Sequence, residues 1–386
     1  MLLIAAALAN PNYVSGSDGS AGPILVSTGE TLAWPLPEDG IVHATSVTVE
    51  AGGLLVFTRN TYNTPVRLLA TDAVVIAGTV SVSGEDGTPT AAGAGGPGGF
   101  DGGAPGMGQG VVEAGRGRGP GGGQPFLSAN LAYSGASAPV QQRGFALIGG
   151  SGGGGVYVQG PPSNQESCGG GGGGGALVIA STASITVDGV VESRGGLASA
   201  ACVAQIPPTE SYKSGGGGGT LRLVAPSVGG TGSLDVSHPV LGEDNGGHIR
   251  VDTLRPGVDD VGLTLHTRAD RTFHGDVLVT YPLGGVNPRV VIDEVDGNAI
   301  DELTGPDFVS VPPGGSTVYT TLRVVDPGSR ARWQLCTGAF TEHVEYGQGH
   351  ATSGCCTVAD ASVSPTCVAG VDLQDLRTYT FTAYAR

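Results

Sequence analysis

The chain has 386 residues, of which 71 are glycine, and its 18 basic and 34 acidic residues give a formal net charge of −16. This length allows two or three domains with cores of their own. Glycine is more than twice as frequent as its usual share of roughly 7%. The acidic balance argues against nucleic acid or anionic lipid as the main partner.

The N-terminus carries a short apolar stretch, Leu2–Leu8, that runs into an Ala-Leu-Ala site at residues 7–9. This pattern resembles the end of a secretory signal peptide but lacks the basic n-region. It is far shorter than the roughly 20 residues that a membrane span needs. Three interpretations stay open: a cleaved signal remnant, a retained segment that caps the fold locally, and a retained segment that serves as a donor strand. A retained segment would offer Leu2, Leu3, Ile4 and Leu8 for insertion into a neighbouring molecule as a donor strand.

The first long region is rich in predicted strands. Segments 46–57 and 65–84 alternate β-branched and polar residues with period 2 and are separated by Gly or Asn-Thr turns. We therefore divide the chain into an N-terminal leader (1–23), a strand-rich start (24–90), a glycine-rich region (91–257) and a C-terminal domain (258–386).

The glycine-rich region contains a repeat. Segment 171–196 aligns with segment 215–237, with 44 residues between Ala176 and Thr220. Segment 64–87 has the same strand-turn-strand order, and segments 151–160 and 245–253 are interpreted as truncated copies. Short strands with glycine at their corners predict a parallel β-helix, or solenoid, of stacked coils. Its inner ladder is predicted to stack residues of successive coils. One coil contributes Leu177, Ile179, Ile185 and Val187, and these are expected to lie above Leu221, Leu223 and Leu234 of the next.

The glycine runs recur beside the same strand position, which favours an ordered role for them. Seven consecutive glycines occupy residues 169–175. Extended glycine segments can pack side by side as polyglycine II, with about three residues per turn and lateral backbone hydrogen bonds. The alternative is that the runs are flexible loops beside a smaller β-core.

The last region predicts an all-β domain. About seven strands are expected over roughly 130 residues, a density typical of an immunoglobulin-like sandwich. Trp333 and Phe381 are its candidate core aromatics. The expected strands are 262–268, 276–282, 288–293, 307–313, 316–326, 331–336 and 378–386.

The cysteine count is even and predicts three disulfides, which indicates an oxidising compartment. Cys168 is expected to pair with Cys202. Adjacent Cys355 and Cys356 point to opposite sides of an extended chain, so they are expected to pair with Cys336 and Cys367.

The stretches 63–84, 95–103, 170–180 and 185–196 resemble glycine-rich secreted or cell-surface β-solenoid proteins of Gram-negative bacteria. The glycine runs also resemble the polyglycine II cores of some phage adhesin tips and of a glycine-rich antifreeze protein. The resemblance covers roughly residues 65–251. It implies exposure and stacking, not one activity.

The sequence contains few patterns that carry chemistry. Walker and HExxH motifs are missing. Asp293, Asp296 and Asp301 are weak calcium candidates, because Val295 occupies the third EF-hand ligand position. Asp-Gly-Asn at 296–298 also predicts a hairpin turn. No cofactor is otherwise expected, and Asp188, Glu192 and Asp235 are interpreted as isolated acids. The histidines, interpreted as scattered, are His43, His238, His248, His266, His274, His343 and His350.

The function expected from these patterns is that of a non-enzymatic extracellular structural protein, a self-associating subunit of a surface fibre or matrix. One alternative is an adhesin or phage receptor-binding protein that recognises a carbohydrate. Its candidate sugar-stacking aromatics are Tyr13, Tyr62, Phe100, Phe126 and Tyr133. A second alternative is a polysaccharide-degrading β-helix enzyme, a lyase or glycosidase.

Overall fold

The structure is a computed structural model of the whole chain. It describes residues 13–106, 114–119, 122–123, 147–159, 165–197, 214–238, 246–258, 260, 262–277, 289–295, 298–299, 316–325, 333–341, 351–358, 366–373 and 379–385. Over these residues the protein is all-β, apart from the 3-10 turn η5 (Ala269–Arg271) and the single helical positions Ser214 and Val277.

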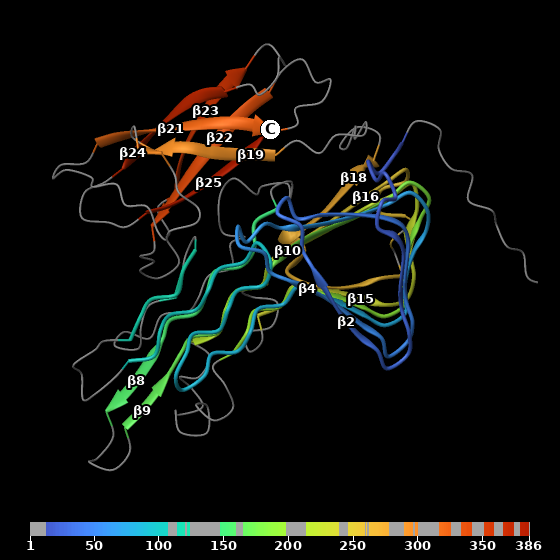
Figure 1. Cartoon of the computed structure of the whole chain (residues 1–386), viewed down its shortest axis with the longest axis horizontal. Coiled ribbons are helices and arrows are strands. Elements are labelled where there is room, and N and C mark those ends of the chain that lie inside the picture. The colour runs from blue at the N-terminus through green and yellow to red at the C-terminus, as the bar shows by residue number, and fades with distance from the viewer. Residues whose placement is uncertain are drawn as a thin grey trace, which may run out of the picture.

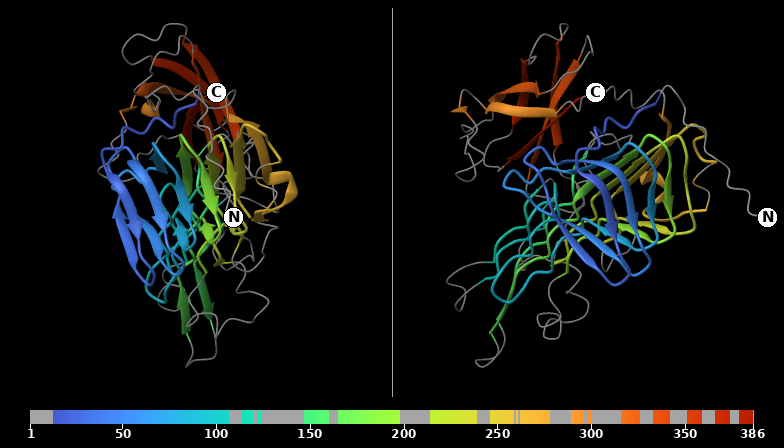
Figure 2. Two further views of the ribbon diagram at one scale, coloured as in Figure 1. Left: turned by 90° about the vertical axis from the view of Figure 1, so that its right-hand side faces the viewer. Right: turned by 45° about the vertical axis from the view of Figure 1, so that its right-hand side comes forward.

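The larger part of the described chain is a parallel coil with three faces (Figures 1 and 2). Its first strands are β1 (Gly22–Val26), β2 (Thr31–Pro35), β3 (Ile41–Val49), β4 (Leu54–Thr58), β5 (Val66–Ala70), β6 (Val74–Ile76) and β7 (Thr79–Ser81). The coil continues with β10 (Ala176–Ser181), β11 (Ile185–Val187), β12 (Val190–Glu192), β13 (Thr220–Val224), β14 (Val228–Gly229), β15 (Ser233–Asp235), β16 (His248–Thr253), β17 (Thr264–His266) and β18 (Thr272–Asp276).

Strand β3 forms the corner between the first two faces. Its first half pairs with β5 and its second half pairs with β6. The first face therefore runs β3, β5, β10, β13, β16, β18, and the second runs β1, β3, β6, β11, β14. The third face is a separate sheet in the order β2, β4, β7, β12, β15, β17. All of these pairs are parallel, as a solenoid requires.

The core consists of ladders of aliphatic side chains that point into the coil. On the first face one ladder joins Val42, Leu68, Ile179, Leu223 and Val251, each in register with the next. All five are buried. Because strand side chains alternate between faces, every second residue contributes to this core.

The predicted 44-residue repeat is confirmed, because Ala176 and Thr220 are in-register partners and Leu177 and Ile179 lie beside Leu221 and Leu223. One neighbour differs. Leu234 pairs with Val191 on the third face, not with Val187. The difference arises because β11 and β12 belong to separate faces although only two residues separate them.

The two ends of the coil close differently. At the first coil, Leu32 and Trp34 pack against the core and remain partly exposed. At the last strand, the inward ladder ends in polar residues, since His274 follows Val251. The His274 Nδ1 atom lies 2.9 Å from the Oδ2 atom of buried Asp260.

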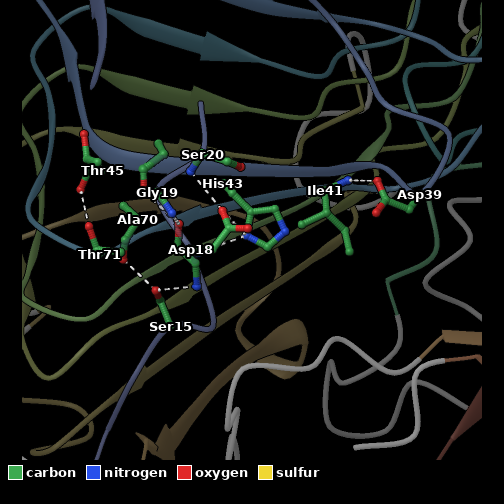
Figure 3. Close-up of polar contacts among 12 residues, drawn as sticks. Ser15, Asp18, Gly19, Ser20, Asp39, Ile41, His43, Thr45, Ala70 and Thr71 are labelled. Atoms are coloured by element: carbon green, nitrogen blue, oxygen red, sulfur yellow. Dashed lines mark hydrogen bonds and ion pairs between the residues drawn. The ribbon is translucent and has the colours of Figure 1, made fainter. Parts of the chain in front are cut away.

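A short N-terminal strap, residues 13–20, crosses the outside of the coil (Figure 3). The Ser17 hydroxyl donates to the carbonyl of Ala44 at 2.8 Å, and the Ser15 hydroxyl donates to that of Ala70 at 2.6 Å. The Tyr13 hydroxyl donates to the carbonyl of Val224 at 3.4 Å. The strap therefore ties together coils that are far apart in sequence.

The boundary expected at residue 258 is wrong, because the solenoid continues past it. Strand β17 pairs in parallel with β15, and β18 pairs in parallel with β16. Segment 262–268, expected to be a sandwich strand, thus supplies the third face of a coil. Its Leu265 is the in-register neighbour of Leu234 and packs against the same core, which explains why this segment belongs to the solenoid.

Segment 151–160 is not a truncated coil. Strand β8 (Val156–Gln159) pairs antiparallel with β9 (Gln165–Cys168), so the two strands make a hairpin. They lie at the far tip of a glycine-rich extension from the coil (Figure 1).

The C-terminal strands form two antiparallel sheets. One has the order β20, β19, β21, β24 and the other has the order β23, β22, β25. Their bounds are β19 (Arg289–Val295), β20 (Asn298–Ala299), β21 (Ser316–Val325), β22 (Trp333–Thr341), β23 (Ala351–Val358), β24 (Thr366–Leu373) and β25 (Tyr379–Ala385). Strand β23 lies close to β24, and β19 lies close to β25, so the sheets approach each other. The expected segment 307–313 lies outside the described residues.

Candidate functional site

The most unusual site in the described chain is a bundle of extended glycine-rich segments that leave the coil after its third face and return to its first. The step from Val42 to Leu68 is 26 residues, whereas the step from Leu68 to Ile179 is 111. The additional residues build the extension, which we call the glycine bundle. Segment 169–175 lies at its centre and every one of its glycines is buried.

The backbone N–H groups of segment 169–175 point in three directions in turn. Gly169, Gly172 and Gly175 donate to the carbonyls of segment 82–88 at 2.7 to 2.9 Å. Gly170 and Gly173 donate to segment 100–103 at 2.9 and 2.8 Å. Gly171 and Gly174 donate to segment 214–217 at 2.7 and 2.9 Å. The partner repeats every third residue, which is the repeat of a helix with three residues per turn.

The carbonyls of the same segment accept from three further segments. Those of Gly170 and Gly173 accept from Gly93 and Gly96, each at 2.9 Å. Those of Gly171 and Gly174 accept from segment 150–153 at 2.8 and 2.7 Å. The carbonyl of Gly172 accepts from Gly196 at 2.7 Å. Segment 169–175 therefore has six neighbours, three that accept from it and three that donate to it.

The six neighbours also bond to one another and close a ring around the centre. Around this ring the donor and acceptor pairs are Glu85 to Ala94, Gly102 to Gly93, Gly103 to Gly153, Gly217 to Ser151, Gly216 to Gly196 and Gly84 to Arg194, all at 2.8 or 2.9 Å. Such saturation is what buried backbone groups require, because an unpaired buried N–H or carbonyl is costly.

The spacing of this bundle excludes side chains. A Cβ atom added to any glycine from 169 to 175 would lie less than 3.0 Å from backbone atoms of a neighbouring segment. Real Cβ atoms essentially never approach so closely. Glycine is needed here for close approach of backbones, and not for a left-handed φ angle.

One non-glycine residue inside the bundle was missed by the sequence reasoning. Ser193 is fully buried, and its hydroxyl donates to the carbonyl of Gly175 at 2.6 Å. Its position directly after β12, where the chain leaves the coil, was the available signal.

Two histidines lie at the edge of the bundle, beside segment 214–219. Burial lowers the pKa of His238 to about 4, although a hydrogen bond to the backbone of Gly215 acts in the opposite direction. Burial and the nearby Arg271 guanidinium lower the pKa of His248 to about 4, against the attraction of Asp270. The ring of His248 stacks on that of Phe273, with 5.7 Å between centroids. These two histidines are therefore not scattered surface residues.

A buried charge cluster covers part of the first face from outside. Asp252 is fully buried, and its Oδ2 atom accepts from the Arg222 Nε atom at 2.8 Å. Its Oδ1 atom lies 2.8 Å from the Arg250 Nη2 atom. Arg222 and Arg250 are in-register partners on β13 and β16. The sequence reasoning did not identify this cluster, although the 28-residue step between the two arginines follows from the aligned strands.

The acids of the third face are not all isolated, contrary to the expectation. Glu192 is the in-register neighbour of Asp235, and Asp235 is the in-register neighbour of His266. The Asp235 carboxylate also accepts from the backbone of Ser237 at 2.9 Å and lies 3.6 Å from the Arg194 Nε atom. Asp188 is separate and accepts from the backbone N–H of Thr231 at 3.0 Å.

Most other predicted site residues lie outside the described part. This holds for the assembly residues Leu2, Leu3, Ile4 and Leu8, and for Cys202, Asp296, Asp301, Phe126, Tyr133, His343 and His350. Asp293 belongs to β19, and Val295 pairs antiparallel with Asn298, as the predicted hairpin requires. No group of three metal-ligating side chains occurs among the described residues.

Cys168 and Cys356, the cysteines whose side chains the structure describes, carry no free thiol. Cys168 is buried at the end of β9, and Cys336 is the in-register partner of Cys355 across β22 and β23. Cys356 follows on β23 and Cys367 lies on β24. The predicted pairing of Cys168 with Cys202, and of Cys355 and Cys356 with Cys336 and Cys367, stays a prediction.

Of the candidate sugar-stacking aromatics, Tyr13 is excluded by its burial at the start of the strap, where it packs against Leu69 and Val224 and only 2% of it is exposed. Phe100 is partly buried and packs against Gly119. Tyr62 is also partly buried.

Comparisons with family models, curated proteins and solved structures found no match to this chain. No helix among its described residues is long and apolar enough to cross a membrane.

Proposed function

We propose that this protein is a non-enzymatic extracellular structural protein and a subunit of a surface fibre or matrix. The observation that carries the proposal is the ring of six segments around residues 169–175, each joined to the centre by backbone hydrogen bonds. We assign this bundle to the polyglycine II type, because its partners change with a three-residue period. A bundle whose central segment has no side chains and bonds through its backbone to six neighbours suits a rigid spacer.

Assembly of the fibre is proposed to use the N-terminal apolar segment and not head-to-tail stacking of solenoids. An open solenoid end exposes strand edges and invites stacking. Here the inward ladder of the last strand carries Thr272 and His274, where earlier coils have Ile249 and Val251. Stacking a second solenoid on this end would bury the His274–Asp260 pair against aliphatic side chains, which is unfavourable.

Negative-stain microscopy of the purified protein tests the proposal. The intact chain is expected to form fibres, and deletion of residues 1–9 is expected to leave discrete particles. In a matched control, Thr272→Val makes the solenoid end more apolar. This variant is expected to form fibres as the intact chain does. Mass spectrometry of the mature N-terminus shows whether residues 1–9 are retained. Fibres that persist after the deletion would exclude the donor segment, and an intact chain that stays discrete would exclude the fibre.

An extracellular location is proposed from the lack of a free thiol at Cys168 and Cys356 and from the resemblance to secreted glycine-rich proteins. Peptide mapping without reduction is expected to find Cys168 linked to Cys202. Recovery of either cysteine as a free thiol in the native secreted protein would contradict this assignment.

A second candidate function is carbohydrate binding by an adhesin or phage receptor-binding tip. It is favoured by the β8–β9 hairpin, which lies at the tip of the bundle, far from the coil (Figure 1). A rigid stalk that presents a small exposed element suits receptor recognition. Glycan-array binding by discrete particles, lost when residues 157–166 are replaced by a Gly-Ser linker, would support this function over the fibre.

A third candidate, a polysaccharide-degrading enzyme, is favoured only by the neighbouring acids Glu192 and Asp235 on the third face. Neighbouring parallel strands lie about 4.8 Å apart, which resembles the spacing of roughly 5 Å between carboxylates in retaining glycosidases. Release of products from acidic or neutral glycans, lost in both Glu192→Gln and Asp235→Asn, would support it. Inactivity of the intact chain on a polysaccharide panel is the outcome expected from the structural proposal.

A further inference from the structure

One edge of the glycine bundle is covered by two short segments that each bring a histidine. Segment 236–238 is joined to segment 246–248 by a hydrogen bond from Gly247 to the carbonyl of Val236 at 2.7 Å. The backbone of His248 donates to the carbonyl of Gly219 at 3.0 Å. The ring of His238 lies against Gly215, so that a Cβ atom there would be 2.6 Å from its Nε2 atom. The two histidines thus flank the two ends of segment 214–219, His238 through its ring and His248 through its backbone.

Both imidazoles are removed from water. His238 is 1% exposed and His248 is 4% exposed. The charged groups that act on His248 come from the turn before β18, where Arg271 opposes its protonation and Asp270 favours it. At His238 the opposing effect is burial, and the favouring effect is the bond to Gly215. A proton on either ring therefore places a poorly compensated charge beside the bundle.

We propose that segments 236–238 and 246–248 form an acid-sensitive latch, which holds segment 214–219 on the glycine bundle at neutral pH and releases it in acid. The latch is built from the two rings and from hydrogen bonds to its backbone, and the Arg271 guanidinium donates one of them to the carbonyl of Gly246. The hydroxyl of Thr267 contributes one of these bonds, to the carbonyl of Gly247 at 2.6 Å.

The direction of the pH effect follows from the two folded-state pKa values of about 4, which lie below the ordinary histidine value of 6.5. The latch is fully stable above pH 6.5 and loses stability as the pH falls toward 4. Between pH 7 and pH 4.5, the equilibrium constant for opening rises about 60-fold for each imidazole that becomes solvated.

The three-residue period of the bundle supplies a specific readout. Among the central glycines, only Gly171 and Gly174 donate to segment 214–217, whereas Gly170 and Gly173 donate to segment 100–103. Release of the latch therefore exposes the amides of Gly171 and Gly174 and leaves those of Gly170 and Gly173 bonded.

Amide hydrogen exchange of the full chain at pH 7 and pH 4.5, corrected for intrinsic exchange rates, tests this. The protection factors of Gly171 and Gly174 are expected to fall at least tenfold more than those of Gly170 and Gly173. The double variant His238→Gln with His248→Gln should remove this difference, while His43→Gln, at a partly exposed ring, should keep it. Equal loss of protection at all four amides, or an unchanged difference in the double variant, would overturn the latch. If the double variant does not fold, the four wild-type amides still decide the question.

Discussion

The solenoid and the glycine bundle are both made of extended chain, but they are held together by different parts of it. In the solenoid, aliphatic side chains such as Leu223 and Ile179 stack in register inside the coil. In the bundle, segment 169–175 has no side chains, and its backbone bonds to six neighbours. The solenoid is stabilised by burial of apolar area. The bundle depends on hydrogen bonds and on contacts between backbones.

This difference sets what each region tolerates. An aliphatic core accepts another side chain of similar volume, because burial is not directional. The central segment 169–175 accepts none, because the place of a side chain is taken by a neighbouring backbone. It must also offset the large conformational entropy that glycine loses on folding. The bundle can therefore form only if its backbone N–H and carbonyl groups are hydrogen-bonded.

The largest expected effect is that of a single methyl group in the bundle centre. In Gly173→Ala the new Cβ atom would lie within 3.0 Å of the backbone of Gly150 and Ser151. The segments must separate and break bonds, so we expect a loss of at least about 3 kcal/mol in the free energy of unfolding. Gly29→Ala is the control, because a Cβ there meets no atom within 4 Å and only its φ of +76° is unfavourable. Urea unfolding measures both, and equal small losses would show the bundle to be loose.

Much of the solenoid could be predicted from sequence, because period-2 alternation and the 44-residue repeat place side chains directly. The bundle was predictable only as a possibility, since glycine runs have the same composition in a packed segment and in a flexible linker. Which segments meet depends on where the chain leaves and re-enters the coil. The pairing of Glu192 with Asp235 was missed because the alignment used the step of 44 residues from Ala176 to Thr220, whereas the third face steps by 43 residues.

The second effect concerns charge on the outside of the coil. Asp252→Asn leaves two buried guanidinium groups, those of Arg222 and Arg250, without the carboxylate that they share. Removing one partner of a buried ionic cluster costs about 3–5 kcal/mol. Asp270→Asn is the matched control, because its pair with Arg268 is exposed and contributes less than about 1 kcal/mol. Chemical denaturation at neutral pH measures both, and similar losses would mean that water reaches the cluster.

The third effect sharpens the contrast directly. Leu223→Ala should cost about 2–5 kcal/mol through lost burial and a cavity, whereas Leu223→Met should cost less than about 1.5 kcal/mol. Unfolding by urea gives both values. At Gly173, by contrast, we expect every replacement to cost more than Leu223→Met does. A Met variant as damaged as the Ala variant would indicate that the ladder is as intolerant of shape changes as the bundle.

The smallest effect concerns the strap, where side chains and backbone act together across the coils. Ser15→Ala removes the hydroxyl that donates to the carbonyl of Ala70, at a site where Ser15 itself is fully buried. The same hydroxyl accepts from the backbone of Ser17 and from the Thr182 hydroxyl, each at 3.2 Å. We therefore expect a loss of about 1–2 kcal/mol in the free energy of unfolding. Ser20→Ala, at an exposed position of the same strap, should change the free energy of unfolding by less than about 0.5 kcal/mol. Amide exchange separates local from global effects. If Ser15→Ala lowers amide protection in β5 and β10 and leaves that of Gly172 unchanged, the strap stabilises the solenoid alone. Equal losses in the solenoid and at Gly172 would mean that the solenoid and the glycine bundle unfold as one unit.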